Sequence, residues 1–275
     1  MNDNFIGYTT YAKHKSGIMA TSGKHCVVTG GTGRVGSVFT THLLDCGSRV
    51  ISLSRSYNRF VEFSETLPTE LQAKLHWVEF DLAKPETFQY ARNRILEIVP
   101  TVDILVNNAS ASNRGANFTY NVESLEAEMW GVFGGCVLFT EMLLPHIRSS
   151  ANGLIINVGS IFGHRAPNHA MYLDLDIGPS TVLSSGKAAI AQFSSYLASR
   201  EAKFGIRANT LIPGFFPRTG LVERPDYIEQ IHNKTLLRKV GLLEDLVAPV
   251  AILLSSGSGF CTGQTLVVDG GYSIW

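Results

Sequence analysis

Thr29-Gly-Gly-Thr-Gly-Arg-Val-Gly36 is the stretch that decides the fold of this 275-residue chain. It follows the short apolar run His25–Thr29, which is typical of a buried strand, and it opens a segment with helical spacing. Gly30, Gly33 and Gly36 recur at every third position. This spacing allows a tight turn, close approach of the backbone to a pyrophosphate group, and close packing of a helix on a strand. The stretch therefore predicts a dinucleotide-binding turn.

The composition is that of an ordinary globular protein. Hydrophobic residues make up 45% and charged residues 17% of the chain, which is enough to bury a sizeable core. The formal net charge is zero, so we expect no nucleic-acid or membrane partner, and no apolar run approaches the length of a membrane span. The four cysteines are far apart and lack metal-ligand spacing, which favours reduced thiols in a cytoplasmic protein and no metal site.

Strand-like and helix-like segments alternate along the rest of the chain. Seven apolar runs are typical of strands: His25–Thr29, Val50–Ser54, His76–Phe80, Val102–Val106, Leu154–Val158, Ile206–Thr210 and Thr265–Val268. Such alternation predicts an α/β fold, a single doubly wound Rossmann-type domain over residues 24–275, with a seven-stranded, mainly parallel sheet and helices on both faces. Residues 1–23 form an N-terminal extension that we expect to be loose or docked on a partner. Pro249 should kink the expected helix Glu244–Leu254 or displace its start.

The end of the second strand predicts which dinucleotide binds. An acidic residue there would bind the ribose hydroxyl of NAD, but this chain has Ser54 and Arg55. An arginine can pair with a 2′-phosphate, so NADP is the expected cofactor and NAD is less favoured. The cofactor-binding residues expected on these grounds are Gly30, Thr32, Gly33, Arg34, Val35, Gly36, Ser54 and Arg55.

Further motifs occur in a fixed order after this turn: Asp81-Leu82, Asn107-Asn-Ala-Ser110, Asn157-Val-Gly-Ser160, Leu183-Ser-Ser-Gly-Lys187, Asn209-Thr-Leu-Ile-Pro-Gly214 and Val268-Asp-Gly-Gly271. In this order they resemble the short-chain dehydrogenase/reductase family over about residues 24–275. The resemblance implies an oxidoreductase that forms homodimers or homotetramers. It also implies further cofactor-binding residues, namely Asp81, Leu82, Asn108, Ala109, Lys187, Pro213 and Gly214.

The active-site helix departs from the family pattern Tyr-x-x-x-Lys. Leu183 stands four residues before Lys187, and a leucine can neither donate nor accept a proton. The resemblance implies that Ser160 orients the substrate oxygen and that the family's catalytic asparagine position falls on Val132. We predict Ser160, Lys187 and, as a substitute acid, Tyr172 as the catalytic residues.

Tyr172 belongs to an insertion, His169–Ser180, between Ser160 and Leu183. The insertion follows the C-terminal end of a strand, where open α/β sheets bind ligands. His164 or His169 could be a general base, and Tyr172 could instead pack in the loop core. Asp174 and Asp176 lack an evident third ligand for a metal. The insertion and the chain ending resemble a subgroup associated with bacterial surface-sugar and sugar-acid pathways.

Phe215, Phe216 and Arg218 lie just after the Pro-Gly element. We expect the two phenylalanines to wall the site, Arg218 to hold an anionic substrate group, and Thr219–Leu236 to form a substrate lid.

Three functions remain open on this sequence. The leading one is an NADP(H)-dependent oxidoreductase acting on a hydroxyl or carbonyl group of a polar, sugar-like small molecule. The second is a non-redox enzyme on the same fold, such as a lyase, dehydratase or isomerase, because Leu183 and Val132 remove polar groups. The third is a protein that binds the cofactor without turnover.

Overall fold

The computed structural model describes residues 5, 7–14, 23–112, 119–172, 178–218 and 220–274. Seven strands form one sheet in the order β3-β2-β1-β4-β5-β6-β7, and each neighbouring pair is parallel. The strands are β1 (His25–Thr29), β2 (Arg49–Ser54), β3 (Leu75–Glu79), β4 (Ile104–Asn107), β5 (Leu154–Val158), β6 (Arg207–Pro213) and β7 (Thr265–Val268). The predicted α/β fold is confirmed, and the sheet is entirely parallel.

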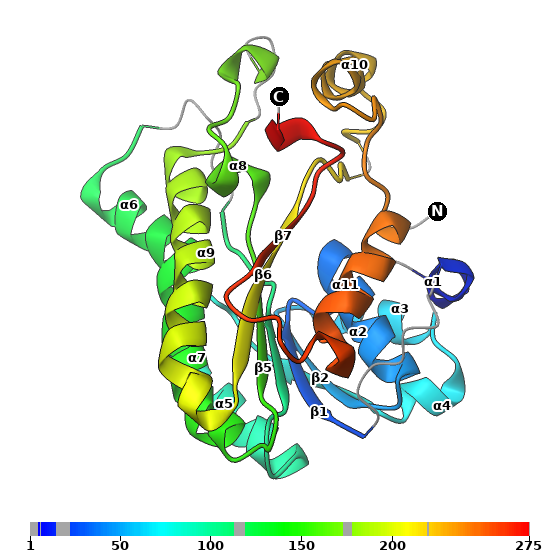
Figure 1. Ribbon diagram of the computed structural model, residues 1–275, viewed down its shortest axis with the longest axis vertical. Coiled ribbons are helices and arrows are strands. Elements are labelled where there is room, and N and C mark those ends of the chain that lie inside the picture. The colour runs from blue at the N-terminus through cyan, green and yellow to red at the C-terminus, as the bar shows by residue number, and fades with distance from the viewer. Residues whose placement is uncertain are drawn as a thin grey trace.

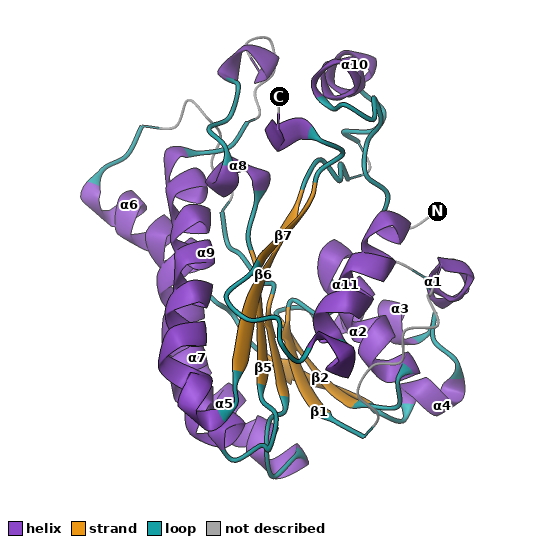
Figure 2. Cartoon of the chain, viewed as in Figure 1, coloured by secondary structure: helices purple, strands orange, loops and turns teal. Residues whose placement is uncertain are grey.

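Helices cover both faces of the sheet (Figure 1, Figure 2). One face carries α5 (Glu86–Ile98), α7 (Gly135–Arg148) and α9 (Thr181–Glu201), and the other carries α2 (Arg34–Asp45) and α11 (Val247–Leu254). The remaining α-helices are α1 (Tyr8–His14), α3 (Tyr57–Ser64), α4 (Thr69–Gln72), α6 (Val122–Met129), α8 (Ile161–His164) and α10 (Pro225–Lys234). The short π- and 3₁₀-helices are η1 (Trp130–Gly134), η2 (His169–Tyr172), η3 (Ala202–Phe204), η4 (Leu243–Leu246), η5 (Ser256–Ser258) and η6 (Tyr272–Ile274).

The strands are apolar throughout because both faces of the sheet are buried. In β1, Cys26 and Val28 belong to the core under α2 and α11, whereas Val27 belongs to the core under α5, α7 and α9. Side chains alternate between the two faces of a strand, so a strand buried on both sides needs apolar residues at every position.

Pro249 displaces the start of its helix, as predicted. The helix expected over Glu244–Leu254 begins as an α-helix at Val247, and η4 precedes it. Pro249 is then in the first turn of α11, where a backbone N–H has no partner within the helix and its absence costs little.

We expected no apolar run to approach the length of a membrane span, but one helical run in the described part of the chain, Val122–Arg148, is long and apolar enough to cross a membrane by length and composition. Half of its most apolar window is buried within the protein. Phe139, Leu143 and Ile147 are among the buried residues, and they pack in the core beneath the sheet. We therefore explain its apolarity by core packing.

Part of the N-terminal extension is a docked helix. α1 lies against α2 and α11, and the side chain of Tyr11 is fully buried. The Tyr11 hydroxyl is 2.9 Å from Nδ1 of His42, and the Tyr8 hydroxyl donates to Oδ1 of Asp45 over 2.8 Å. We expected an extension that is loose or docked on a partner, but α1 packs on its own domain. A helix with a buried Tyr11 and a half-buried Tyr8 gains stability by this packing.

Protonation of His42 should weaken this docking. Burial lowers the pKa of His42 from 6.5 to about 4. The unfolded chain therefore binds more protons between these two pH values, and the free energy of unfolding falls as the pH falls through that range. We expect His42 to account for up to about 3 kcal/mol of this loss. His42→Gln, which does not titrate, should show a smaller loss in urea titrations across the range, and an unchanged loss would contradict the prediction.

Candidate functional site

A cavity of about 320 Å³ opens at the carboxyl ends of β1, β2, β3 and β4. The strand order reverses between β1 and β4, which is where open α/β sheets bind their ligands. Its described lining is Gly30, Thr32, Gly33, Leu53, Ser54, Arg55, Ser56, Arg59, Phe80, Asp81, Leu82, Asn108, Ala109, Ser110 and Ala111. Most of the residues predicted to bind a dinucleotide are thus brought to one cavity.

The glycine-rich turn is built so that only glycine fits at its ends. Gly30 has φ +63°, and a Cβ on Gly36 would lie 2.1 Å from the Gly30 carbonyl oxygen. The Asn108 side-chain amide donates to the carbonyl oxygens of Thr29 and Gly30, each over 3.0 Å. α2 begins directly after the turn, and the partial positive charge of a helix N-terminus favours a phosphate there.

Two arginines and two serines gather at the end of β2. Arg55 and Arg59 are exposed, and both line the cavity. Ser56 caps α3 by accepting a hydrogen bond from the Arg59 backbone N–H over 3.3 Å, and Ser54 accepts one from the Trp77 indole over 3.0 Å. We did not predict Ser56 or Arg59. A serine is a typical N-cap residue, and Arg59 lies in the first turn of the helix that Ser56 caps, so the sequence could have indicated both.

Arg34 lies elsewhere. Its guanidinium donates to the carbonyl oxygen of Pro217 over 2.9 Å, which ties the start of α2 to the segment after β6. The Arg34 side chain is therefore not part of the cavity lining, although we predicted Arg34 as a cofactor-binding residue. Among the described residues, the predicted residues that do not line the cavity are Arg34, Val35, Gly36, Lys187, Pro213 and Gly214.

A buried chain of polar side chains steadies the sheet below the site. The Asn107 amide donates to Asn157 Oδ1 and to the Thr140 hydroxyl, each over 2.8 Å. The Asn157 amide donates to the Ser194 hydroxyl over 2.8 Å, and the Thr210 hydroxyl donates to the same oxygen over 2.7 Å. This network links β4, β5 and β6 to α7 and α9, so it holds the strand ends that surround the site.

Lys187 and Ser160 lie at one corner of the site. The Lys187 ammonium donates to the Val158 carbonyl oxygen over 2.8 Å, and burial lowers its pKa to about 8. Ser160 follows Val158 and caps α8, its hydroxyl oxygen accepting from the Phe162 N–H over 3.2 Å. α8 packs tightly on α9, because a Cβ on Gly163 would lie 2.5 Å from the Lys187 carbonyl carbon.

Leu183 and Val132 occupy the same neighbourhood as Lys187. Leu183 is half-buried in the first turn of α9, one turn before Lys187. Val132 is buried in the π-helical turn η1 and packs against Gly186, where a Cβ would lie 2.7 Å from Val132 Cγ1. π-Turns are frequent at functional sites, and here the turn presents an apolar side chain.

Tyr172 is buried in an apolar cluster beside the site. Its ring lies 6.4 Å from that of Phe162 and 6.5 Å from that of Tyr227. Its hydroxyl has no hydrogen-bond partner within the described residues, and burial raises its pKa well above the ordinary value. Phe215 packs in the same cluster, 6.0 Å from Phe162, so the segments after β5 and β6 meet there.

The other polar residues of the insertion and the lid contribute little to the described site. His164, His169 and Arg218 are exposed. Asp174, Asp176 and Thr219 lie outside the described residues. Within the described part of the chain, no three His, Cys, Asp or Glu side chains come together as a metal site would require.

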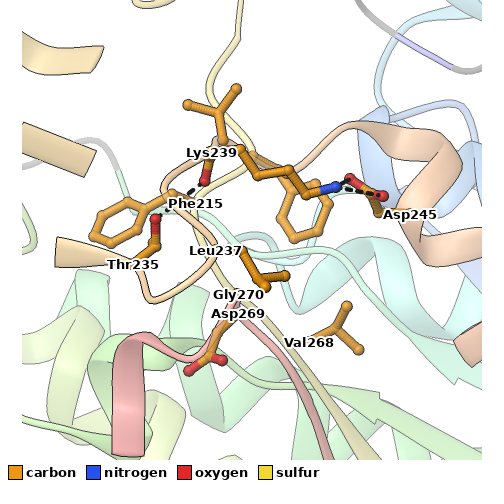
Figure 3. A pocket seen from close by; sticks show the side chains of 11 residues that line it. Phe215, Thr235, Leu237, Lys239, Asp245, Val268, Asp269 and Gly270 are labelled. Atoms are coloured by element: carbon orange, nitrogen blue, oxygen red, sulfur yellow. Dashed lines mark hydrogen bonds and ion pairs between the residues drawn. The ribbon is translucent and has the colours of Figure 1, made fainter. Parts of the chain in front are cut away.

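A smaller cavity of about 200 Å³ lies under the loop between α10 and η4 (Figure 3). Phe215, Phe216, Leu237 and Val268 contribute to its apolar lining. The Lys239 ammonium at its edge pairs with Asp245 over 3.1 Å. The third charged residue of its lining, Asp269, accepts hydrogen bonds from the backbone N–H groups of Gly271 and Ser273. Since these charged groups already have partners, the larger cavity and the Lys187 corner are the better candidates for the functional site.

Comparison with known proteins identifies relatives of the whole domain. The profile of the family described as short chain dehydrogenase matches residues 24–226. An uncharacterised oxidoreductase of Schizosaccharomyces pombe is 27% identical over 92% of this chain and 92% of its own length. A probable galactose dehydrogenase of Rhizobium meliloti is 25% identical over 89% of this chain and 93% of its own.

Solved structures show the same arrangement of elements. The NADP complex of RhlG from Pseudomonas aeruginosa has a TM-score of 0.81 at 25% identity and covers 94% of this chain and 100% of its own. A short-chain dehydrogenase from Leptospira borgpetersenii with bound NAD+ has a TM-score of 0.78 at 26% identity and covers 94% of this chain and 96% of its own.

Burying the Lys187 ammonium should cost folding stability. Its pKa is lowered from 10.5 to about 8, so the unfolded chain binds more protons between these pH values and the wild-type protein gains stability as the pH rises through them. Lys187→Met should be more stable than the wild type by up to about 3 kcal/mol at neutral pH. Chemical unfolding at neutral and alkaline pH measures this. A variant that is less stable at neutral pH, or a gain that persists at alkaline pH, would contradict the assignment.

Proposed function

This chain belongs to the short-chain dehydrogenase family, and from that premise we propose that it is an NADP(H)-dependent oxidoreductase with an altered catalytic group. Its substrate in this proposal is a polar, sugar-like small molecule with a hydroxyl or carbonyl group. The protein acts as a cytoplasmic homodimer or homotetramer. Residues 24–275 form the catalytic domain, and residues 1–23 are its N-terminal extension.

The observation that carries the proposal is the cavity at the reversal of strand order. The close contact of Gly36 with Gly30 leaves no room for a side chain at position 36, which allows the close helix–strand packing of a dinucleotide-binding turn. Asp81 and Leu82 line the same cavity at the end of β3, where the family's adenine contact is expected. The donor set therefore fits a dinucleotide.

The exposed guanidinium groups of Arg55 and Arg59 favour NADP over NAD. Guanidinium groups bind phosphate oxygens through charge-assisted hydrogen bonds, and both groups line the cavity at the end of β2. The relatives leave this choice open, because one similar structure holds NADP and another holds NAD+.

The residues around Lys187 would bind the substrate oxygen and the cofactor ribose through hydrogen bonds. NADP(H), when bound, supplies or accepts a hydride. Ser160 uses its oxygen to cap α8 and keeps its hydroxyl hydrogen to donate to a substrate oxygen. Lys187 would bind the cofactor ribose, exchanging its hydrogen bond to the Val158 carbonyl oxygen for one to a ribose hydroxyl.

The proton must come from a group other than Leu183. We propose Tyr172, because its buried hydroxyl has no partner in the described structure and can donate to a substrate oxygen without breaking an existing hydrogen bond. Burial raises the pKa of Tyr172, so the phenol keeps a proton to donate but is a weaker acid than an exposed tyrosine.

Within this proposal, the substrate class is a sugar-like molecule. This assignment rests on the insertion between Ser160 and Leu183, and the relative named as a probable galactose dehydrogenase supports it.

Leu183 and Val132 also favour a second candidate, a protein that binds the cofactor but catalyses no net redox reaction. The cofactor cavity needs neither missing group, so binding without turnover, or a lyase, dehydratase or isomerase reaction, is compatible with it. Incubating the protein with deuterium-labelled NADPH and candidate carbonyl compounds separates the cases. Label in the product supports hydride transfer, and product without label supports the second candidate.

Arg55 and Arg59 should determine the choice of cofactor. Arg55→Ala and Arg59→Ala should each weaken NADPH binding about tenfold and leave NADH binding unchanged, because only NADPH carries the 2′-phosphate. Titration of the intrinsic fluorescence measures both affinities. Arg49→Ala, at the opposite end of β2, is the matched control and should change neither. Equal losses for both cofactors would contradict the proposed 2′-phosphate site.

Tyr172→Phe should lower the turnover of a carbonyl substrate by roughly 10²–10⁴-fold with NADPH affinity unchanged. It should not lower the free energy of unfolding, because the hydroxyl it removes has no partner in the described structure. Tyr227→Phe, in the same buried cluster, is the matched control for packing. Full turnover by Tyr172→Phe would rule out Tyr172 as the acid.

Leu183→Tyr tests the missing acid directly. Leu183 is half-buried in the first turn of α9, and a phenol there, one turn before Lys187, restores the family pairing. We expect reductase activity to rise by about tenfold or more. Leu183→Phe carries the ring without the hydroxyl and should show no gain. If the folded tyrosine variant also shows none, the site differs from the family in more than its acid.

A further inference from the structure

Glu128 is a buried carboxylate that the proposed function does not use. It lies in α6, and its residue exposure is 3%. Its Oε1 accepts hydrogen bonds from the hydroxyl groups of Ser112 and Ser180, the latter over 2.8 Å, and its Oε2 accepts one from the Tyr120 hydroxyl. We call these four residues the Glu128 cluster.

Hydrogen bonds within the cluster offset the unfavourable free energy of burying the Glu128 carboxylate. A carboxylate out of water is unfavourable unless donors surround it, and an ionised carboxylate is an acceptor only. Three hydroxyl groups donate to it, so the ionised form is well solvated by the protein. Burial and the hydrogen bond to Glu128 raise the pKa of Tyr120, which keeps the phenol in its donating form.

One side of the cluster adjoins the cofactor cavity. Ser112 directly follows Ala111, which lines the cavity. The Ala111 N–H donates to the Gly131 carbonyl oxygen over 2.9 Å, so the segment after β4 packs on the helix that continues from Glu128. Ser112 therefore connects the carboxylate to the cavity wall.

The other side of the cluster adjoins the helix that carries Lys187. Ser180 is the N-cap of α9, and its hydroxyl oxygen accepts a hydrogen bond from the Leu183 N–H over 2.9 Å. Lys187 is one turn further along α9. Through the Ser180 hydroxyl the carboxylate is linked to the backbone at Leu183, the position of the family's tyrosine.

We propose that Glu128 is a positioning residue that fixes the nicotinamide half of the cofactor site, and this rests on the proposed function. By holding Ser112 and Ser180 on one oxygen, it sets the distance between the cavity wall at Ala111 and the first turns of α9. In a site without the usual tyrosine, this bridge keeps Lys187 aligned with the ribose that it is to bind. The adenine half, at the ends of β2 and β3, does not depend on it.

A second buried glutamate, at the C-terminal end of α9, provides a matched control. Glu201 is fully buried near the C-terminus of α9 and accepts hydrogen bonds from Arg148 and Arg200, between 2.6 and 2.8 Å. Replacing either glutamate by glutamine weakens the anchoring of one end of α9. Only Glu128 lies beside the cofactor cavity.

The first test compares two ligands, NADPH and adenosine 2′,5′-bisphosphate, which contains only the adenine half. Glu128→Gln should bind NADPH about tenfold more weakly and the bisphosphate with unchanged affinity. Glu201→Gln should bind both like the wild type. Equal weakening of both ligands by Glu128→Gln, or no weakening of either, would overturn the proposal. Wild-type protein that binds both ligands without carbonyl turnover would contradict the proposed function alone.

Hydrogen exchange tests the bridge without any ligand. Glu128→Gln should speed exchange of the amides in the first turns of α9, from Leu183 to Lys187, by about tenfold, and Glu201→Gln should speed exchange only in its last turns. Uniform loosening of α9 in both variants, or unchanged exchange in Glu128→Gln, would overturn the positioning role.

Single hydroxyl deletions keep the test valid if Glu128→Gln folds poorly. Ser180→Ala removes the tie to α9 and Ser112→Ala the tie to the cavity wall, and each should selectively weaken NADPH binding. Glu128→Asp, which keeps the charge, should recover part of the NADPH affinity. Failure of both serine variants to change NADPH binding would contradict the bridge.

Discussion

The hydrogen bonds from the Asn108 amide to the carbonyl oxygens of Thr29 and Gly30 join the two strands between which the strand order reverses. They hold the glycine-rich turn against the end of β4, and Gly36 can then approach the Gly30 carbonyl oxygen closely enough to exclude any Cβ. The shape of the cavity depends on this contact, because the same turn sets the direction in which α2 leaves the sheet. The same close contact in the turn thus determines both the shape of the ligand cavity and the packing of α2 on the sheet.

The corner around Lys187 is held differently. Lys187 is buried with only a backbone carbonyl oxygen as its described hydrogen-bond partner, and its pKa is depressed as a result. A buried, weakly compensated ammonium is unfavourable for folding, which is typical of residues retained for binding or catalysis. Leu183 and Val132 add apolar surface around it, which lowers the local polarity.

Polar groups inside the domain concentrate around α9. Glu128 anchors its N-terminus, Ser194 joins it to β5 and β6, and Glu201 anchors its C-terminus through Arg148 of α7. Buried polar groups are costly unless satisfied, but when satisfied they specify one packing arrangement where apolar contacts tolerate several. The helix that carries Lys187 is therefore held in register along its length, while the apolar faces of the sheet supply the bulk of the burial.

The order of elements, the parallel sheet and the glycine-rich turn could all be predicted from the sequence, because each leaves a local signature in spacing. The same is true of Arg55 and of Leu183, whose positions follow from their distance to a strand end and to Lys187. Boundaries shifted by a few residues, as at β4 and β6, because strand pairing depends on neighbours that spacing alone does not reveal.

Only the tertiary structure decided what these residues touch. It joined Arg34 to Pro217, Tyr11 to His42, and Glu128 to Ser180, and it placed Arg59 on the cavity. Side-chain hydrogen bonds between residues far apart in the chain produce no periodicity, and a buried glutamate has the same letter in the sequence as an exposed one. The sequence by itself determined the architecture and the place of Leu183 four residues before Lys187, whereas folding determined which polar groups surround that position.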